Sequence, residues 1–213
     1  MRLVVTFLIA SSLLLVFPGC EDLDPNTFEP LPGEKPTFGA DYLPLVLGDT
    51  LNYRVGVQTV GFTLGGDTTL NGELYQSMVP DQLGVDTLFY RKSGTIIFSR
   101  EIIPVALDPY LFLPILDINR SVGDNWRTSH FSNNGNPLFI DSSIDGLEAT
   151  RTIGGRTYTD VVRVVQRVTE EFFDPFAGGT EDFVHGINVI WYARDIGIIE
   201  RSFLDGSTVR LLD

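Results

Sequence analysis

Few residues of this 213-residue sequence belong to the types that carry out covalent or metal chemistry. There is one cysteine, Cys20, and there are two histidines, His130 and His185. Metal sites gather several such ligands at short spacings, and no such group occurs here. Glycine-rich nucleotide loops and the Gly-x-Ser-x-Gly motif are also missing, so we expect no cofactor and a non-enzymatic role. A hydrolase is an alternative, because a Ser-His-acid triad can be dispersed along a chain; it requires one histidine near a serine and an acid.

The acidic loop "DPFAGGTED" holds the candidate metal ligands, Asp174, Glu181 and Asp182. Ca²⁺ binds several carboxylate and carbonyl oxygens around a loop, but this stretch lacks the regular alternation of known calcium loops. We therefore expect a solvated turn and no bound metal. The whole chain is acidic, with a formal net charge of −13. Nucleic-acid binding depends on clusters of Lys and Arg, and none occurs, so we expect no nucleic-acid partner.

Cys20 follows a stretch with the order of parts found in an export signal. Arg2 supplies a positive charge, and residues 3–17 are uncharged and mostly apolar. This run is shorter than the ~20 residues of a membrane-spanning helix. With Gly19 before the cysteine, the stretch resembles the lipobox of bacterial lipoproteins. The resemblance implies a signal peptide over residues 1–19, cleavage after Gly19, and acylation of Cys20 by diacylglycerol and an N-linked chain such as palmitate. The alternative is an ordinary signal peptide and an unrelated cysteine.

Residues 20–40 are rich in proline and acidic residues, which predicts an extended tether without a core of its own. The acidic run "EDLD" after the cysteine resembles export signals that direct Bacteroidota lipoproteins to the surface of the outer membrane. The alternative is a solvated linker. We expect a protein of the cell envelope, anchored to the outer membrane by its lipid and facing either the periplasm or the exterior. An envelope protein is a further expected partner.

From residue 41 to residue 213 the sequence predicts a single antiparallel β domain. Short segments rich in Val, Ile, Thr and aromatics alternate with turn signals such as Gly154-Gly155, a two-residue hairpin turn. Parallel strands would need longer connections. We expect a meander of about 9–11 strands that forms a curved sheet, half-barrel or barrel. Residues 157–172 read as a long strand, with a helix as the alternative, so the domain has at most one helix.

Several strands carry apolar residues on both faces, as in "INVIWYA". A sheet that is wet on one side would alternate more regularly, so both faces are expected to be covered. The interior of such a barrel is either a packed core or a ligand cavity. The aromatic residues Trp126, Trp191 and Tyr192 are expected in or beside the core, and the alternative makes them candidate ligand-binding residues.

Three stretches, "LPLVLGDTLNY", "IGGRTYTDVVRV" and "WYARDIGIIERS", resemble a set of β-rich, lipid-anchored envelope proteins of Bacteroidota that mostly have no assigned function. The resemblance implies an antiparallel, half-barrel-like domain and brings no catalytic residues. We therefore expect a lipid-anchored envelope protein with a binding or structural role. The first alternative is a carrier that holds an apolar ligand in a lipocalin-like or half-barrel cup, and the second is the hydrolase.

Overall fold

The computed structural model describes residues 35–36, 41–176, 178–203 and 206–212. The predictions for the signal peptide, for Cys20 and for nearly all of the tether lie outside these residues. The described residues form twelve strands and no helix, which confirms the predicted all-β class, with one strand more than expected. The strands are β1 (Thr50–Val55), β2 (Gln58–Leu70), β3 (Glu73–Pro80), β4 (Leu88–Ser93), β5 (Ile96–Ile102), β6 (Tyr110–Asp117), β7 (Asn125–Phe131), β8 (Pro137–Ile153), β9 (Arg156–Asp174), β10 (Gly179–Ala193), β11 (Gly197–Ser202) and β12 (Thr208–Leu211).

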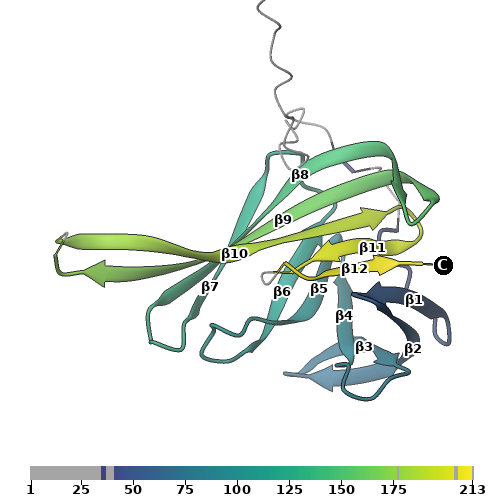
Figure 1. Ribbon diagram of the computed structural model, residues 1–213, viewed down its shortest axis with the longest axis horizontal. Coiled ribbons are helices and arrows are strands. Elements are labelled where there is room, and N and C mark those ends of the chain that lie inside the picture. Colours follow the sequence, from purple (N-terminus) through teal and green to yellow (C-terminus); the bar gives the residue numbers. More distant parts are fainter. Residues whose placement is uncertain (1–34, 37–40, 177, 204–205, 213) are drawn as a thin grey trace, which may run out of the picture.

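All twelve strands join one antiparallel sheet in the order β6-β5-β4-β3-β2-β1-β12-β11-β10-β9-β8-β7 (Figure 1). The order describes two meanders, β1–β6 and β7–β12, in which each strand pairs with its neighbour in sequence. The first and last strands then pair with each other, with Tyr53 opposite Leu211. In the described part of the chain, no helix is long and apolar enough to cross a bilayer.

The two ends of the strand order, β6 and β7, approach each other and nearly close the sheet into a barrel. An isolated bridge joins Ala106, between β5 and β6, to Ser132 after β7. On the same seam, Nε1 of Trp126 donates a hydrogen bond to the carbonyl oxygen of Pro114 at 2.9 Å. The twist of a large sheet and these few links bring the edges together without a continuous ladder between them.

The β8–β9 hairpin forms as the sequence predicts. Gly154 and Gly155 have φ values of 60° and 88°, the left-handed region that a tight primed turn needs at both central positions. The segment that follows is strand β9, so the helical alternative for residues 157–172 is wrong. The apolar positions of this segment fit the periodicity of a helix as well as that of a strand. Its many valines are stiff at χ1 and pack well on a pleated sheet, and this preference favours the strand.

Large side chains fill much of the interior. Tyr192 on β10 is fully buried, and its hydroxyl donates to the carbonyl oxygen of Ile115 on β6 at 3.5 Å. Its neighbour Trp191 is also buried, and the guanidinium of Arg151 lies 3.5 Å from the centre of its ring. A stacked guanidinium covers the aromatic face while it keeps its own charge near water. Both aromatic residues therefore belong to the packed part of the fold.

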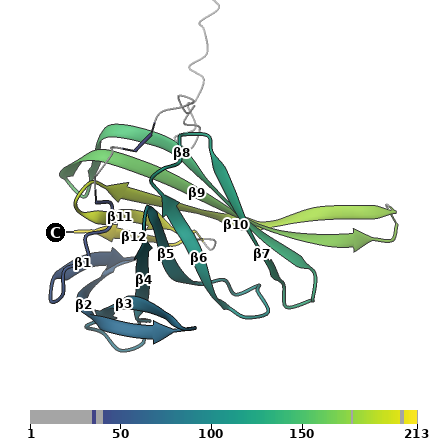
Figure 2. The ribbon, with the colours of Figure 1, turned by 180° about the vertical axis from the view of Figure 1, so that it is seen from behind.

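One hairpin extends beyond the barrel. The pairing of β8 with β9 ends at Leu138 and Glu170, while β9 and β10 continue together to their turn. Residues 171–176 and 178–182, which we call the finger, project away from the other strands in both views (Figures 1 and 2). Phe173 and Phe176 on the finger are 66% and 98% exposed, so these large apolar side chains contribute little to the core.

Candidate functional site

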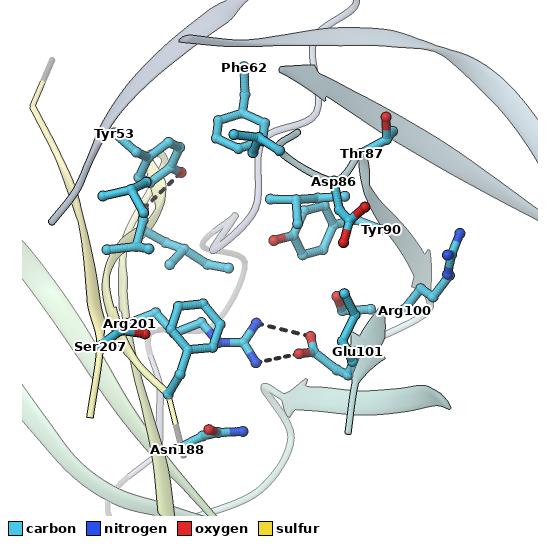
Figure 3. A pocket seen from close by; sticks show the side chains of 18 of the residues that line it. Tyr53, Phe62, Asp86, Thr87, Tyr90, Arg100, Glu101, Asn188, Arg201 and Ser207 are labelled. Carbon is cyan, nitrogen blue, oxygen red and sulfur yellow. Dashed lines mark hydrogen bonds and ion pairs between the residues drawn. The ribbon is translucent and has the colours of Figure 1, made fainter. Parts of the chain in front are cut away.

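A cavity of about 420 Å³ lies between the two meanders (Figure 3). This volume is in the range of pockets that hold small organic molecules, roughly 300–1,000 Å³. Strands β1, β2, β4 and β5 supply one side, and β10, β11 and β12 supply the other. The cavity is lined by Tyr53, Val55, Phe62, Val85, Asp86, Thr87, Leu88, Tyr90, Ser99, Arg100, Glu101, Ile102, Pro104, Asn188, Ile198, Arg201, Phe203, Ser207 and Val209.

Aromatic and aliphatic side chains make up most of the wall. The rings of Tyr53 and Phe62 meet edge to face, with their centres 5.9 Å apart. The hydroxyl of Tyr53 donates to the carbonyl oxygen of Ile198 at 3.1 Å, so its polar atom is satisfied within the wall. Burial raises the pKa of Tyr53 and of Tyr90, since a phenolate would be poorly solvated here. Both phenols therefore stay neutral at physiological pH.

An ion pair crosses the cavity from one meander to the other. Nη1 of Arg201 on β11 donates to Oε1 of Glu101 on β5 at 3.1 Å, and Nη2 donates to Oε2. Burial alone would raise the pKa of Glu101, but the charge of Arg201 and its hydrogen bonds outweigh burial and lower it. Burial likewise opposes the charge of Arg201, and the carboxylate nevertheless raises its pKa. Both groups are therefore ionised, and each neutralises the other.

Two neighbours extend this polar region. Ser99, two residues before Glu101 on the same face of β5, hydrogen-bonds to the Glu101 carboxylate and to Tyr90. Asn188 on β10 is 3% exposed and lies below the ion pair in Figure 3. Its Oδ1 atom is buried and accepts no hydrogen bond from the described residues. The cavity lining thus combines an apolar wall, a neutralised ion pair and two buried atoms without partners among the described residues, Oδ1 of Asn188 and Nε of Arg201.

A second buried carboxylate lies at the base of the finger. Oε1 of Glu170 accepts hydrogen bonds from the Ser132 hydroxyl at 2.7 Å and from Nδ2 of Asn136 at 2.8 Å. Oε2 lies 2.8 Å from Nε2 of His185. In a Ser-His-acid triad the imidazole lies between the acid and the serine. Here the carboxylate lies between them, so the serine hydroxyl is bonded to the acid and not to the imidazole.

The remaining sequence candidates lie on β7 and on the finger. His130 is on β7, where burial lowers its pKa and Nε2 has no hydrogen-bond partner among the described residues. Asp174, Glu181 and Asp182 are on the finger, and Oδ1 of Asp174 accepts the backbone N–H of Phe176 at 2.7 Å. Within the described ranges, no three His, Cys, Asp or Glu side chains are grouped to hold a metal ion.

Trp126, Trp191 and Tyr192, the aromatic candidates for ligand binding, do not line the cavity. The cavity residues that sequence reasoning missed are Glu101, Arg201 and Asn188, together with the tyrosines of the wall. A signal for the two charged residues is present in "IIFSREI" and "GIIERSF", where two adjacent charged residues fall among apolar residues of a strand. Comparison of the chain with family models, with curated proteins and with solved structures finds no match.

Proposed function

We propose that the β domain binds a small, mostly apolar molecule in the cavity between its two meanders. The observation that carries this proposal is the cavity itself: about 420 Å³ of space lined mainly by aromatic and aliphatic side chains. Protein interiors are ordinarily close-packed, so an apolar hollow of this size offers room for a bound molecule. Of the roles expected from the sequence, the carrier of an apolar ligand is the one that the geometry favours.

We place this carrier in the cell envelope, as a lipoprotein held by acyl chains on Cys20. Apolar molecules are sparingly soluble, so a binding domain near a membrane could take up or deliver them where they are most concentrated. One acyl chain holds a protein only marginally, while several chains hold it firmly, because each buried CH₂ adds about 0.8 kcal/mol. The Cys20→Ser variant is expected to leave the membrane fraction, and its retention there would contradict the anchor.

The binding proposal is tested with the neutral fluorescent probe N-phenyl-1-naphthylamine. The probe brightens when it enters an apolar site, and we expect saturable binding with one site per chain. The Leu88→Trp variant introduces a larger ring at a position that lines the cavity. This change is expected to weaken probe binding at least tenfold, because the ring occupies the space that the probe needs.

Phe89→Trp is the matched control, since Phe89 follows Leu88 on β4 and does not line the cavity. On the outer face, the guanidinium of Arg100 lies 5.1 Å from the centre of the Phe89 ring. We expect this variant to bind the probe as the unmodified protein does. No saturable binding by the unmodified protein, or equal weakening in both variants, would contradict the proposal. Mass spectrometry of organic extracts from the native protein then identifies the molecule that it carries.

A further inference from the structure

Residues 179–187 of β10, which we call the β10 edge, run along the finger and its base. We propose that this edge binds an extended, basic segment of a partner protein, which pairs with β10 as an added strand. Three features of the described residues support the inference: an unpaired strand edge, exposed apolar side chains along it and unneutralised negative charge. The site is separate from the cavity, whose lining includes none of residues 179–187.

The β10 edge has a neighbouring strand on one side only. On that side it pairs with β9, with a bulge between Val184 and Gly186. On the other side β11 pairs with β10 from Val189 to Ala193 and no further. Alternate residues of an antiparallel strand direct their N–H and C=O groups to opposite sides, so every second residue of the β10 edge faces no strand. Such an edge can accept an added strand through main-chain hydrogen bonds.

Space for another strand exists beside this edge. Figures 1 and 2 show the finger clear of the other strands. At its base, Phe183 and Ile187 are 54% and 50% exposed, and Val184 is 36% exposed. Phe183 lies opposite Glu170 and Val184 lies opposite Thr169, so the two apolar side chains point to opposite faces of the ribbon. A strand with two adjacent apolar residues covers both of them, one on each face.

The finger carries negative charge and contains no Lys or Arg. Its acidic residues are Glu171, Asp174, Glu181 and Asp182. Glu181 and Asp182 are exposed, and neither forms an ion pair with a described residue. Arg127 on β7 lies near enough to attract Asp182, but its Nε and Nη2 atoms donate to Asp141 at 2.6 and 2.8 Å. The two carboxylates are therefore available to a cation from outside the chain.

The order of residues along β10 defines the order expected in the partner. Glu181 and Asp182 come directly before Phe183 and Val184. An antiparallel strand with two apolar residues opposite Val184 and Phe183 has its next two residues opposite Asp182 and Glu181. Lys or Arg at those two positions forms opposite-charge pairs across the strands, which stabilise a sheet. The partner segment thus has two adjacent apolar residues followed by two adjacent basic residues.

Charge also argues against two other occupants of the edge. A second copy of this chain, with its net charge of −13, would bring a second set of finger carboxylates close to Glu181 and Asp182. An anionic lipid surface would be repelled by the same carboxylates. A basic segment complements the charge of the edge and gains specificity from it.

The test uses a fluorescein-labelled peptide amide of sequence Gly-Ser-Thr-Val-Ile-Arg-Lys-Thr-Ser-Gly and the full-length protein. Fluorescence anisotropy is expected to show saturable binding, and a peptide with Glu in place of Arg and Lys is expected to bind about tenfold more weakly. Hydrogen exchange supplies the second readout. Amides of residues 179–187 are expected to exchange more slowly when the basic peptide is bound, because main-chain hydrogen bonds protect them. Absence of binding, equal binding of the two peptides or unchanged exchange overturns the inference.

A charge reversal tests the position of the site. In the double variant Glu181→Lys and Asp182→Lys, the acidic peptide is expected to bind about tenfold more tightly than the basic one. The matched control is Asp49→Lys with Asp67→Lys, which makes the same change in charge at two exposed positions of the other meander. This control is expected to keep the preference for the basic peptide. Reversal in both double variants would show that overall charge, and not the β10 edge, selects the peptide.

Two measurements without peptide test the other occupants. Analytical ultracentrifugation is expected to find monomers of the Cys20→Ser variant, and a dimer that Phe183→Ser abolishes would assign the edge to a second copy. Phosphatidylcholine vesicles are expected not to sediment this variant; sedimentation that Phe183→Ser abolishes would assign the edge to a lipid surface. If a finger variant does not fold, the two peptides and the exchange measurement on the unmodified protein decide. All these outcomes are independent of probe binding in the cavity.

Discussion

Two buried glutamates, one in each meander, keep their charge by different means. Glu101 in the cavity and Glu170 at the base of the finger are 4% and 6% exposed, and both have a pKa below the ordinary value. Glu101 is held by a cation, Arg201. Glu170 is held first by the Ser132 hydroxyl and the amide of Asn136, with His185 as a further partner; these contacts lower its pKa to about 2.

The different partners of Glu101 and Glu170 give the two carboxylates different roles. Arg201 neutralises the Glu101 carboxylate, so the ionised pair contributes no net charge to the cavity. Neutral donors leave the negative charge in place, and they fix the position of the groups that donate. The Ser132 hydroxyl also accepts the backbone N–H groups of Asn134 and Asn136, each at 3.2 Å. Glu170 therefore anchors the β7–β8 turn, whereas Glu101 uses up the cation that would otherwise attract anionic ligands.

The largest effect is expected from the loss of the cation. The Arg201→Met variant leaves the Glu101 carboxylate buried without a partner, which costs about 3–5 kcal/mol of unfolding free energy. Denaturation with guanidinium chloride measures this loss. The double variant Glu101→Leu and Arg201→Met removes both charges, and we expect it to recover most of the stability. If the double variant is as unstable as the single one, packing rather than charge accounts for the effect.

Loss of the Glu170 charge is expected to have a smaller effect. Glu170→Gln weakens the hydrogen bonds from Ser132 and Asn136, and about 2 kcal/mol of stability should be lost at pH 7. The folded pKa is about 2, below the ordinary value of 4.5, so the charge stabilises the fold fully above pH 4.5. This contribution disappears as the pH falls through 2. The two proteins should therefore converge in stability over that window, and a constant gap down to pH 2 would contradict the assignment.

The charge balance of the cavity predicts a change in ligand preference. Glu101→Gln frees the guanidinium of Arg201 and removes one negative charge from the lining. Decanoate is expected to bind about tenfold more tightly than it binds the unmodified protein, roughly 1.4 kcal/mol, while decanol changes little. Competition with the fluorescent probe measures both. Glu170→Gln is the control, and an equal gain of decanoate affinity in that variant would show that the effect is not local.

The smallest effect is expected at the tip of the finger. Phe176 is 98% exposed, so Phe176→Ser should change the unfolding free energy by no more than about 0.5 kcal/mol. Val164 lies on the same hairpin inside the barrel and is fully buried. The Val164→Ala variant should cost about 2 kcal/mol, because it leaves a small cavity in the core. Thermal unfolding of both variants marks where the stabilising part of the hairpin ends.

The sequence predicts the architecture because its signals are local. Gly154 and Gly155 fix a tight turn, and the valines of residues 157–172 favour the strand that follows. Every pair of neighbouring strands except β1 and β12 is consecutive in the chain, so each hairpin can be inferred from a few residues. The nearly closed sheet was among the predicted forms, although its number of strands was underestimated by one.

The site could not be predicted, because its residues come from distant strands. Glu101 and Arg201 meet across the barrel, and their pairing depends on the curvature of the whole sheet. Nothing near Asn188 in the sequence shows that its amide oxygen lacks a donor. For Trp126, Trp191 and Tyr192 the sequence favours positions in or beside the core over ligand binding, because each large ring buries much apolar surface. Here the ring of Trp126 closes the seam, and the other two pack in the core.

The pairing of the first strand with the last also has a consequence for how the protein folds. Each meander consists of local hairpins, which form quickly, but the β1–β12 ladder must close a loop that spans almost the entire domain. Glu101 belongs to one meander and Arg201 to the other, so the cavity is expected to be the last part of the molecule to form. A chain still emerging from a ribosome lacks it, so the cavity, and with it the proposed binding, arises only once both meanders are complete.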